Sequence, residues 1–465
     1  MKLLELQPTY ENLIATYKND SIERNTALHY FVELLESLDG CTSISVNGKW
    51  GCGKTFFVKQ AKMIIDSFNE HTNNLTKEEK TEILNTWRAF HITEKDRTLI
   101  PQVCVYYDAW QHDNDDDPLL SLVYEIYTNV ENDYSFKKSK DCIEKCATIA
   151  DLLSSKNYGA VINKLRESDD PLTKVKENRS LTESINDFIS SILPEQGDRL
   201  IIFIDELDRC KPTYAVRLLE RIKHYFSNKN VTFVFSVNLS ELQHTVKQYY
   251  GAEFDASKYL NRFFDIPVTI PKANLKKFYD TLSIVDTRDL CNNIVNSVIK
   301  TYNFELREIA KYRQLIKLAA PLTNPNGSQK YDYSFSEGTG RWLYLNAIVP
   351  IALGLQLYNN TLYNNFLEGK DATPLIDILS TEDYKDWVCS RLLSDSEEFE
   401  DTGTGKTVVK IEDKLKEYYD ALFNYDYNAY NRYQKNIGRV SVTAEAKKSI
   451  FEAISVLSRY ADYSE

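Results

Sequence analysis

The first 275 residues of the chain alternate short apolar runs with amphipathic stretches. Residues 20–40 place leucine and phenylalanine at the i, i+3, i+4 spacing of an amphipathic helix, which we expect to end at Gly40. The β-rich run at 42–46 follows, and it leads into a glycine-rich loop and a second helical pattern. This part of the chain therefore predicts the order helix, strand, loop, helix.

Four more apolar runs have the length of buried strands and are separated by helical patterns. They are QVCVYYDAW at 102–110, RLIIFID at 199–205, NVTFVFSVN at 230–238 and FFDIPVTIP at 263–271. Continuous apolar strands that alternate with amphipathic helices are typical of a parallel sheet covered on both faces. We therefore predict an α/β core with a central parallel sheet.

The pattern changes after Pro271, where helical periodicities with many tyrosines replace the strands. We place a domain boundary near residue 275, so that residues 1–275 form the α/β core and residues 276–465 form a mostly α-helical C-terminal domain. Within the core, the charged stretch at about 125–195 predicts a helical insertion.

The tyrosine-rich segment 416–434 in this second domain has two interpretations. Its rings could stack on nucleic-acid bases, or they could pack between helices. Glu417, Asp420 and Asp426 would repel a phosphate backbone, which favours packing.

Composition limits the partners, metal sites and cellular compartment that we expect for the protein. The net charge of −12 argues against a protein whose main task is to coat nucleic acid or anionic lipid, and no pattern indicates a nucleic-acid partner. The eight cysteines are scattered without a CxxC pair and the six histidines are dispersed, so we expect neither a zinc site nor a disulfide framework. The first thirty residues lack the apolar core and cleavage site of a secretory signal. We expect a cytoplasmic protein with reduced thiols.

One stretch approaches the length of a membrane span. Trp342–Tyr358 has about 17 mostly apolar residues, whereas a spanning helix needs about 20. Asn346, Pro350 and Gly354 interrupt it. We therefore predict a buried helix of the second domain and no membrane span.

The loop after the first predicted strand fits the phosphate-binding pattern GxxxxGK[ST] completely. Its residues are Gly48, Lys49, Trp50, Gly51, Cys52, Gly53, Lys54 and Thr55. Glycines let successive backbone N–H groups turn toward a phosphate, and the helix that follows adds its dipole. Lys54 would bridge the β- and γ-phosphates, Thr55 would bind Mg²⁺, and Phe56 is counted among the residues that line the nucleotide. Because a strand precedes the loop and a helix follows it, a purely structural loop is the weaker interpretation.

A second glycine-rich segment, GTGKT at 403–407, resembles this motif superficially. Glu400 stands where the first glycine should be, and the residues before the segment predict an acidic loop instead of a strand. We assign it no role in nucleotide binding.

The apolar run 200–204 ends in two carboxylates, the usual partner of a phosphate loop. Asp205 would hold Mg²⁺ through water, and Glu206 would act as general base toward the attacking water. Asp208 and Arg209 follow in the same turn. Asp208 and Arg209 have two interpretations, and the sequence leaves both open. They could form a local ion pair, or they could act directly in the site by setting the metal geometry or stabilising charge.

Several segments together resemble the KAP family of P-loop NTPases. They are VNGKWGCGKT at 46–55, VYYDAWQ at 105–111, DELDRCKP at 205–212 with LERIK at 219–223, YYGAEFDASKYLNRFFDIPVTIP at 249–271 and REIAKYRQLIKLA at 307–319. The resemblance implies an ATPase core of the additional-strand type, with strand order 5-1-4-3-2 and with ATP and Mg²⁺ as ligands. Many members carry membrane helices between the two phosphate motifs, whereas residues 60–199 have only polar or amphipathic segments, which implies a soluble member.

The resemblance also implies roles for three polar residues. Asn238, at the end of the fourth strand, would sense the γ-phosphate, or it caps the next helix. Arg262 stands where related ring-forming ATPases present an arginine finger to a neighbouring subunit, or it forms a surface ion pair. Arg307 would be a second-sensor arginine from the helical domain, or part of a solvated helix face. The family often has Asp where this chain has Asn238, and Asn where it has Asp108, which leaves both roles open.

Three further side chains near these motifs have supporting roles in this interpretation. We expect Trp50 to pack against the loop helix or the adenine, and Trp110 to wedge between a strand and a helix. Arg24, which precedes the first strand, is a candidate contact of the nucleotide base.

The resemblance suggests a Mg²⁺-dependent ATPase that forms a homo-oligomer and couples hydrolysis to a conformational or assembly switch. It further suggests bacterial defence against phage or other mobile DNA with a separate effector protein, since no nuclease, protease or deaminase motif is present. Two alternatives stay open. One is an ATP-binding scaffold that barely hydrolyses ATP and uses its helical domain for recognition, and the other is a nucleic-acid-stimulated motor. A small-molecule kinase is least favoured, because no second substrate motif is evident.

Overall fold

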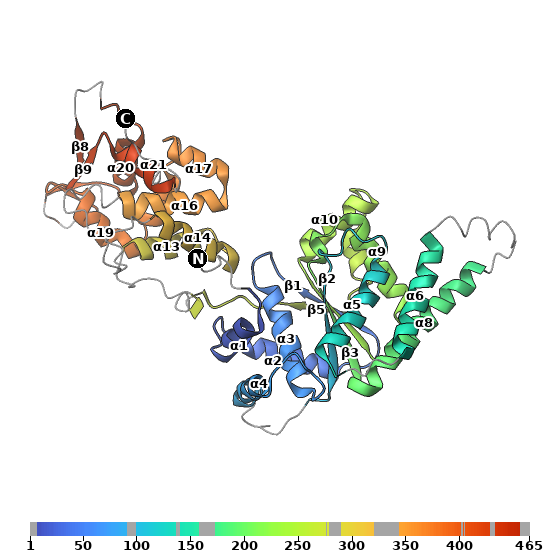
Figure 1. Ribbon diagram of the computed structural model, residues 1–465. Coiled ribbons are helices and arrows are strands. Elements are labelled where there is room, and N and C mark those ends of the chain that lie inside the picture. Colours follow the sequence, from blue (N-terminus) through green and yellow to red (C-terminus); the bar gives the residue numbers. More distant parts are fainter. Residues whose placement is uncertain are drawn as a thin grey trace, which may run out of the picture. The chain divides into compact units, whose positions relative to one another are not determined.

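The computed structural model describes residues 7–90, 99–135, 140–157, 173–275, 277–278, 290–319, 344–400, 403, 405–427 and 433–455 (Figure 1). Backbone contacts divide the chain into two compact units, one that holds Leu6–Leu282 and one that holds Ser283–Glu465. The finer domain limits, 1–275 and 276–465, stay predictions.

Five strands form the central sheet of the first unit. They are β1 (Thr42–Asn47), β2 (Gln102–Asp108), β3 (Arg199–Asp205), β4 (Val231–Val237) and β5 (Ile266–Thr269). All neighbours are parallel, in the order β2-β3-β4-β1-β5. The predicted order 5-1-4-3-2 is therefore confirmed, and β4 lies between the two strands that carry the phosphate motifs. Because the strands are parallel, their carboxyl ends meet at one edge of the sheet, where open α/β folds bind ligands.

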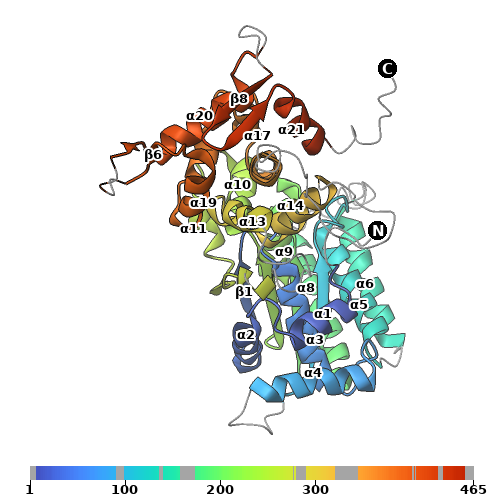
Figure 2. The same cartoon turned by 90° about the vertical axis from the view of Figure 1, so that its left-hand side faces the viewer.

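Four helices cover one face of this sheet (Figures 1 and 2). They are α1 (Tyr10–Lys18), α2 (Asn25–Ser37), α3 (Lys54–Phe68) and α4 (Lys77–Phe90). Apolar side chains of β1 and β3, such as Ile44 and Phe203, share one buried cluster with Val58 and Ile64 of α3. The helix that follows the glycine loop is thereby held against the strands.

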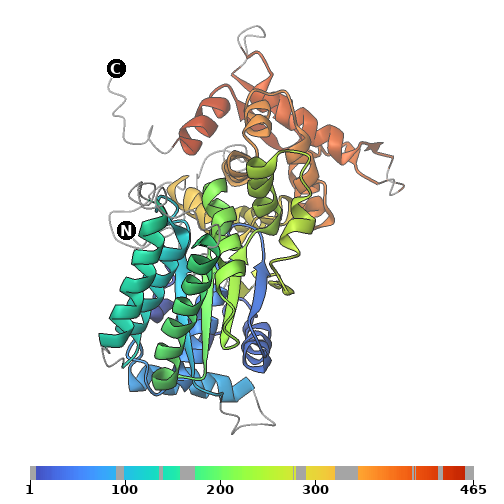
Figure 3. The ribbon, with the colours of Figure 1, turned by 90° about the vertical axis from the view of Figure 1, so that its right-hand side faces the viewer.

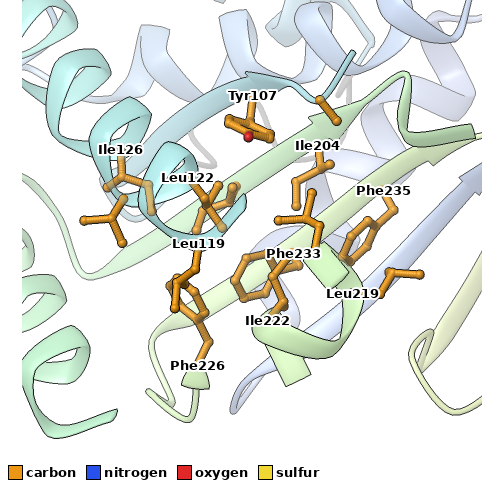
Figure 4. Packing of buried hydrophobic residues seen from close by; sticks show 14 of the residues in the cluster. Tyr107, Leu119, Leu122, Ile126, Ile204, Leu219, Ile222, Phe226, Phe233 and Phe235 are labelled. Atoms are coloured by element: carbon orange, nitrogen blue, oxygen red, sulfur yellow. The ribbon is translucent and has the colours of Figure 1, made fainter. Parts of the chain in front are cut away.

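The opposite face is covered by α5 (Pro118–Asp133), α9 (Pro212–Tyr225), α10 (Leu239–Tyr250) and α11 (Ala256–Leu260). Figure 4 shows Tyr107 of β2 and Phe233 of β4 packed among Leu119, Leu122 and Ile222 of these helices. Neighbouring positions of a strand point to opposite faces, so Tyr107 belongs to this cluster while Tyr106 packs against the cluster around α3.

The described part of the predicted insertion is helical. Its helices α6 (Lys140–Asn157) and α8 (Thr173–Gln196) pack side by side (Figure 3). Ile185 and Phe188 of α8 are fully buried in the cluster that covers the sheet. This helix is therefore the crossover that leads into β3, and the predicted limits of about 125–195 stay a prediction.

The second unit is mostly helical, as predicted. Its described helices are α13 (Leu290–Thr301), α14 (Leu306–Ala319), α16 (Val349–Tyr358), α17 (Asn360–Leu367), α18 (Thr373–Leu379), α19 (Glu382–Leu392), α20 (Ile411–Phe423) and α21 (Ala446–Ile454), with a π-helical turn at Tyr344–Ile348. Two short strand pairs accompany them: parallel β6 (Glu397–Glu398) and β7 (Thr407–Val408), and antiparallel β8 (Gln434–Ile437) and β9 (Val440–Thr443).

Helix α16 contains most of the long apolar stretch and is buried within this unit. The Tyr312 hydroxyl donates to the Pro350 carbonyl at 2.7 Å. A Cβ atom on Gly354 would come within 2.3 Å of a methyl group of Val298, so glycine permits the close approach of α16 to α13. Among the helices that the structure describes, none is long and apolar enough to cross a membrane.

Two other predictions for the C-terminal region can be compared with its structure. Tyr418 and Tyr419 of α20 are buried, and the Tyr419 hydroxyl donates to the Phe366 carbonyl at 2.6 Å, as the packing interpretation expects. Tyr430 lies outside the described residues. In the segment GTGKT, Thr407 begins the short strand β7, so the helix that a phosphate loop requires is not formed at that residue.

A buried ion pair connects α3 to the carboxyl end of α5. The Lys62 ammonium lies 2.7 Å from Asp66 and 3.0 Å from Asp133. Asp66 also accepts hydrogen bonds from Tyr134 at 2.6 Å and from Asn74 at 3.0 Å. Burial disfavours the ammonium, but Asp66 together with Tyr10 and Asp133 outweighs it, so the pKa of Lys62 is raised well above its usual value.

Removal of this cation should destabilise the first unit. We expect Lys62→Met to lower the free energy of unfolding by about 3–5 kcal/mol, because Asp66 would stay buried without its counter-ion. The matched control is Lys18→Met, which breaks an exposed pair with Glu82 and should change stability by at most about 1 kcal/mol. Thermal unfolding of the two variants measures the difference, and equal melting temperatures would contradict the assigned role.

Candidate nucleotide-binding site

The glycine loop connects β1 to α3 and adopts a conformation that needs glycine. Gly51 and Gly53 have φ angles of +77° and +93°, in the left-handed region. A Cβ atom on Gly48 would lie 2.6 Å from the Ile270 side chain and 2.7 Å from the Cys52 sulfur. The loop can therefore bring its backbone close to a phosphate, as the motif predicts.

Two cationic side chains donate hydrogen bonds to backbone carbonyls of the loop. The Lys54 ammonium donates to the carbonyls of Gly48 at 2.7 Å and Lys49 at 3.1 Å, so it lies within the curve of the loop. The buried Arg24 guanidinium donates to the Cys52 carbonyl at 2.7 Å. Arg24 thus supports the loop backbone, a contact that the sequence interpretation of a base contact did not foresee.

Thr55 and Asp205 meet although they are 150 positions apart. The Thr55 hydroxyl, in the first turn of α3, donates to Asp205 Oδ2 at 2.7 Å. Asp205 is the last residue of β3, and its Oδ1 accepts the Glu206 backbone N–H at 3.0 Å. Hydroxyl and carboxylate oxygens are ligands that Mg²⁺ prefers, so these two residues fit the metal that the motif implies.

Glu206 occupies a strained position just beyond the strand. Its φ of +60° is left-handed, which is uncommon for a residue with a Cβ atom. Its carboxylate forms an ion pair with the Arg209 guanidinium. Burial and the neighbouring Asp205 raise the pKa of Glu206 to about 7, while Arg209 opposes this shift. Arg209 pairs with Glu206, so the alternative of a local ion pair between Asp208 and Arg209 fails, and a direct role of Asp208 and Arg209 stays a prediction.

Asp208 instead contacts the loop. It accepts a hydrogen bond from the Trp50 indole N–H at 2.5 Å. Burial raises the pKa of Asp208, and the Trp50 hydrogen bond and the charge of Lys54 oppose this effect. The bond joins the turn after β3 directly to the glycine loop.

Two exposed tryptophans flank Arg209. The guanidinium carbon lies 5.9 Å from the Trp50 ring centre and 5.5 Å from that of Trp110. Trp50 is 45% exposed and Trp110 is 53% exposed, so the expectation that Trp110 wedges between strand and helix is wrong. The exposure of Trp110 follows from Asp108. The Asp108 carboxylate accepts hydrogen bonds from the backbone N–H groups of Trp110 and Gln111 and so turns the chain outward after β2.

Asn238 lies at the carboxyl end of β4, in the same edge of the sheet. It is the N-cap residue of α10, but its side chain makes no capping hydrogen bond. Asn47, which precedes the glycine loop, supplies the cap: its Oδ1 accepts the Leu239 N–H at 3.0 Å. The helix-cap alternative therefore fails for the Asn238 side chain, and its role as a sensor stays a prediction.

Two further predicted site residues are the arginines Arg262 and Arg307. Arg262 follows α11 and is exposed, and it forms no ion pair with the residues that the structure describes. Arg307 lies on α14 in the second unit. Phe56 packs partly buried against the α1–α4 side of the sheet. The roles predicted for these three residues stay predictions.

The sequence interpretation missed Tyr106, Lys59 and Asn47. The Tyr106 hydroxyl donates to Asp205 Oδ2 at 2.9 Å, and the Lys59 ammonium lies 4.2 Å above the Tyr106 ring. One signal for Lys59 was available, because it lies one helical turn after Thr55. No sequence signal marked Tyr106 as a site residue, since aromatic residues are common in buried strands.

Trp50 should report occupation of the site. A nucleotide bound to the loop would place phosphate charge beside its indole, so we expect the intrinsic fluorescence to change on addition of Mg²⁺ and ATP. Trp50→Phe should lose most of this change, and the control Trp387→Phe, in the second unit, should keep it. A full signal in Trp50→Phe would contradict the placement of the nucleotide at this loop.

Comparisons with known proteins place the chain in a family. A model of the KAP family P-loop domain matches residues 27–318. Uncharacterized protein MJ0182 of Methanocaldococcus jannaschii is 28% identical over 168 residues, which cover 27% of this chain and 84% of that protein. Among solved structures, that of C. elegans PCH-2 is 10% identical and covers 87% of this chain and 68% of that chain, with a TM-score of 0.21, which is too low to show a shared fold. Since the family match spans more than half of the chain, the protein belongs to the KAP family of P-loop NTPases.

Proposed function

We propose that the protein is a Mg²⁺-dependent ATPase. Membership of the family supports nucleotide hydrolysis in general terms. The observation that carries the more specific proposal is the 2.7 Å contact between Thr55 and Asp205, beside Lys54 and next to Glu206. In this proposal the contact joins the residue that follows the glycine loop to the end of β3, as a shared nucleotide–metal site would require.

Each residue of the candidate site has a defined task in this proposal. The loop N–H groups and Lys54 bind the β- and γ-phosphates, and Thr55 and Asp205 hold Mg²⁺. The metal, when bound, neutralises charge on the phosphate oxygens. Glu206 orients a water molecule and accepts its proton, and Arg209 holds the Glu206 carboxylate in place.

Two substitutions separate binding from hydrolysis. Lys54→Ala should abolish nucleotide binding and turnover, because the phosphates lose their cation. Glu206→Gln keeps the shape of the side chain and the loop, so it should bind ATP but release no phosphate above background. Phosphate release and equilibrium ATP binding measure the two steps.

The control for this pair is Glu253→Gln, an exposed carboxylate that should hydrolyse ATP at the wild-type rate. Wild-type turnover in both Lys54→Ala and Glu206→Gln would contradict the mechanism. Unchanged melting temperatures would show that any loss is not caused by unfolding.

We further propose that the active protein is a homo-oligomer in which Arg262 completes the site of a neighbouring copy. The exposure of Arg262, together with its lack of an ion pair to described residues, supports this. The assembly would act as a switch that engages a separate effector protein in bacterial defence against phage or other mobile DNA. The family resemblance supports that wider role.

Shared sites between subunits predict complementation. Arg262→Ala and Glu206→Gln should each be inactive, because an arginine finger is worth about 10³ to 10⁵ in rate. When the two variants are mixed, some sites combine a wild-type Arg262 with a wild-type Glu206, so part of the activity should return. ATPase assays over a range of mixing ratios measure this, and no recovery at any ratio would contradict action between subunits.

One observation favours a second candidate function, an ATP-binding scaffold that barely hydrolyses. Arg209 pairs with the Glu206 carboxylate and opposes the rise of its pKa, so it weakens Glu206 as a general base. Tight ATP binding without phosphate release by the wild-type chain would favour the scaffold over the ATPase.

A further inference from the structure

The Asp205 carboxylate receives hydrogen bonds from three directions. Its Oδ2 accepts the hydroxyls of Thr55 at 2.7 Å and Tyr106 at 2.9 Å, and its Oδ1 accepts the Glu206 N–H at 3.0 Å. A carboxylate has about four acceptor positions, two on each oxygen. The described contacts fill both positions of Oδ2 and one of Oδ1, which leaves one position on Oδ1.

The register of the sheet explains why Tyr106 reaches Asp205. Tyr106 pairs with Phe203 on β3, and Asp108 pairs with Asp205. Side chains two residues apart on a strand share a face, so Tyr106 and Asp205 are diagonal neighbours on the side of the sheet that α3 covers. A long aromatic side chain spans this diagonal and places its hydroxyl on the carboxylate.

The Tyr106 ring is held from several sides. It packs against the buried cluster of the α3 face, and the Lys59 ammonium lies 4.2 Å above it. An ionised carboxylate only accepts hydrogen bonds, so the Tyr106 hydroxyl is the donor in its contact with Asp205. The neighbouring Tyr107 points to the other face, where its hydroxyl pairs with Tyr214 at 2.5 Å.

We propose that Tyr106 is a positioning residue for the metal: its hydroxyl occupies Asp205 Oδ2 together with Thr55 and so presents Oδ1 to the water molecules of Mg²⁺. The inference rests on the proposed function, because it concerns the metal of that site. Mg²⁺ needs near-ideal octahedral geometry and keeps several of its waters, so a carboxylate that can rotate binds it less well. Residues that orient a metal-binding group typically affect metal affinity about 10- to 100-fold when they are lost.

The test compares two neighbouring tyrosines in the full-length protein. Tyr106→Phe removes the hydroxyl and keeps the ring, and Tyr107→Phe is the matched control on the same strand. A fluorescent ATP analogue is titrated at increasing Mg²⁺, and also in EDTA. We expect Tyr106→Phe to raise the half-saturating Mg²⁺ concentration about 10-fold and to leave the affinity in EDTA within about twofold, whereas Tyr107→Phe changes neither value.

A double-substitution cycle separates positioning from a purely structural effect. Asp205→Asn alone should raise the half-saturating Mg²⁺ concentration. Tyr106→Phe should cause no further rise in the Asp205→Asn background, because the hydroxyl acts through the carboxylate. Additive effects of the two substitutions would overturn the proposal. A parallel loss of thermal stability and of affinity in EDTA would also overturn it, since it would assign Tyr106 to the folding of the site.

The outcomes also distinguish this proposal from the proposed function. If the wild-type chain binds the analogue with a clear Mg²⁺ dependence and Tyr106→Phe shows the same dependence, only the role of Tyr106 is wrong. If the wild-type chain binds no nucleotide at any Mg²⁺ concentration, as expected for Lys54→Ala alone, the proposed function is wrong and the role of Tyr106 fails with it.

Discussion

The hydrogen bond between Thr55 and Asp205 depends on a constraint that shapes the whole first unit. These residues follow β1 and end β3, and β4 lies between the two strands. Adjacent strands are about 4.8 Å apart, so the side chains must meet over the end of a strand that belongs to neither motif. They can meet only if all three strands run in the same direction and end at the same level. The parallel register of β1, β3 and β4 supplies this, and the helices on both faces make an all-parallel sheet possible.

Two adjacent carboxylates acquire different properties at this edge. Asp205 is fixed by three hydrogen bonds from Thr55, Tyr106 and the Glu206 N–H, whereas burial and the charge of Asp205 raise the pKa of Glu206. The left-handed backbone at Glu206 turns its side chain away from the direction of the strand and toward Arg209. In the proposed mechanism these different surroundings assign the metal to Asp205 and the proton to Glu206. The left-handed φ angle at Glu206 is what directs the two consecutive side chains to different partners.

The sequence predicted the strands, their order and the loop because these depend on local patterns and on the family resemblance. Continuous apolar runs mark buried parallel strands, and the glycines of the loop have few structural substitutes. The contacts of Tyr106, Arg209 and Trp110 were not predictable, because they depend on the register between strands and on the exact direction of a turn. Lys62 and Asp66 show the same limit: at i, i+4 spacing they resemble an exposed surface pair, and only the fold reveals that both are buried.

Asn47 joins two parts of the first unit that are far apart in the sequence. It precedes the glycine loop, and its side chain is bonded to the first turn of α10, which packs on α11. Arg262 follows that short helix directly. A displacement of the loop backbone would therefore act on the amino end of α10 and, through the packing of α10 on α11, on the helix that precedes Arg262. The Asn47 side chain thus links the phosphate loop to the exposed Arg262 indirectly, by way of α10 and α11.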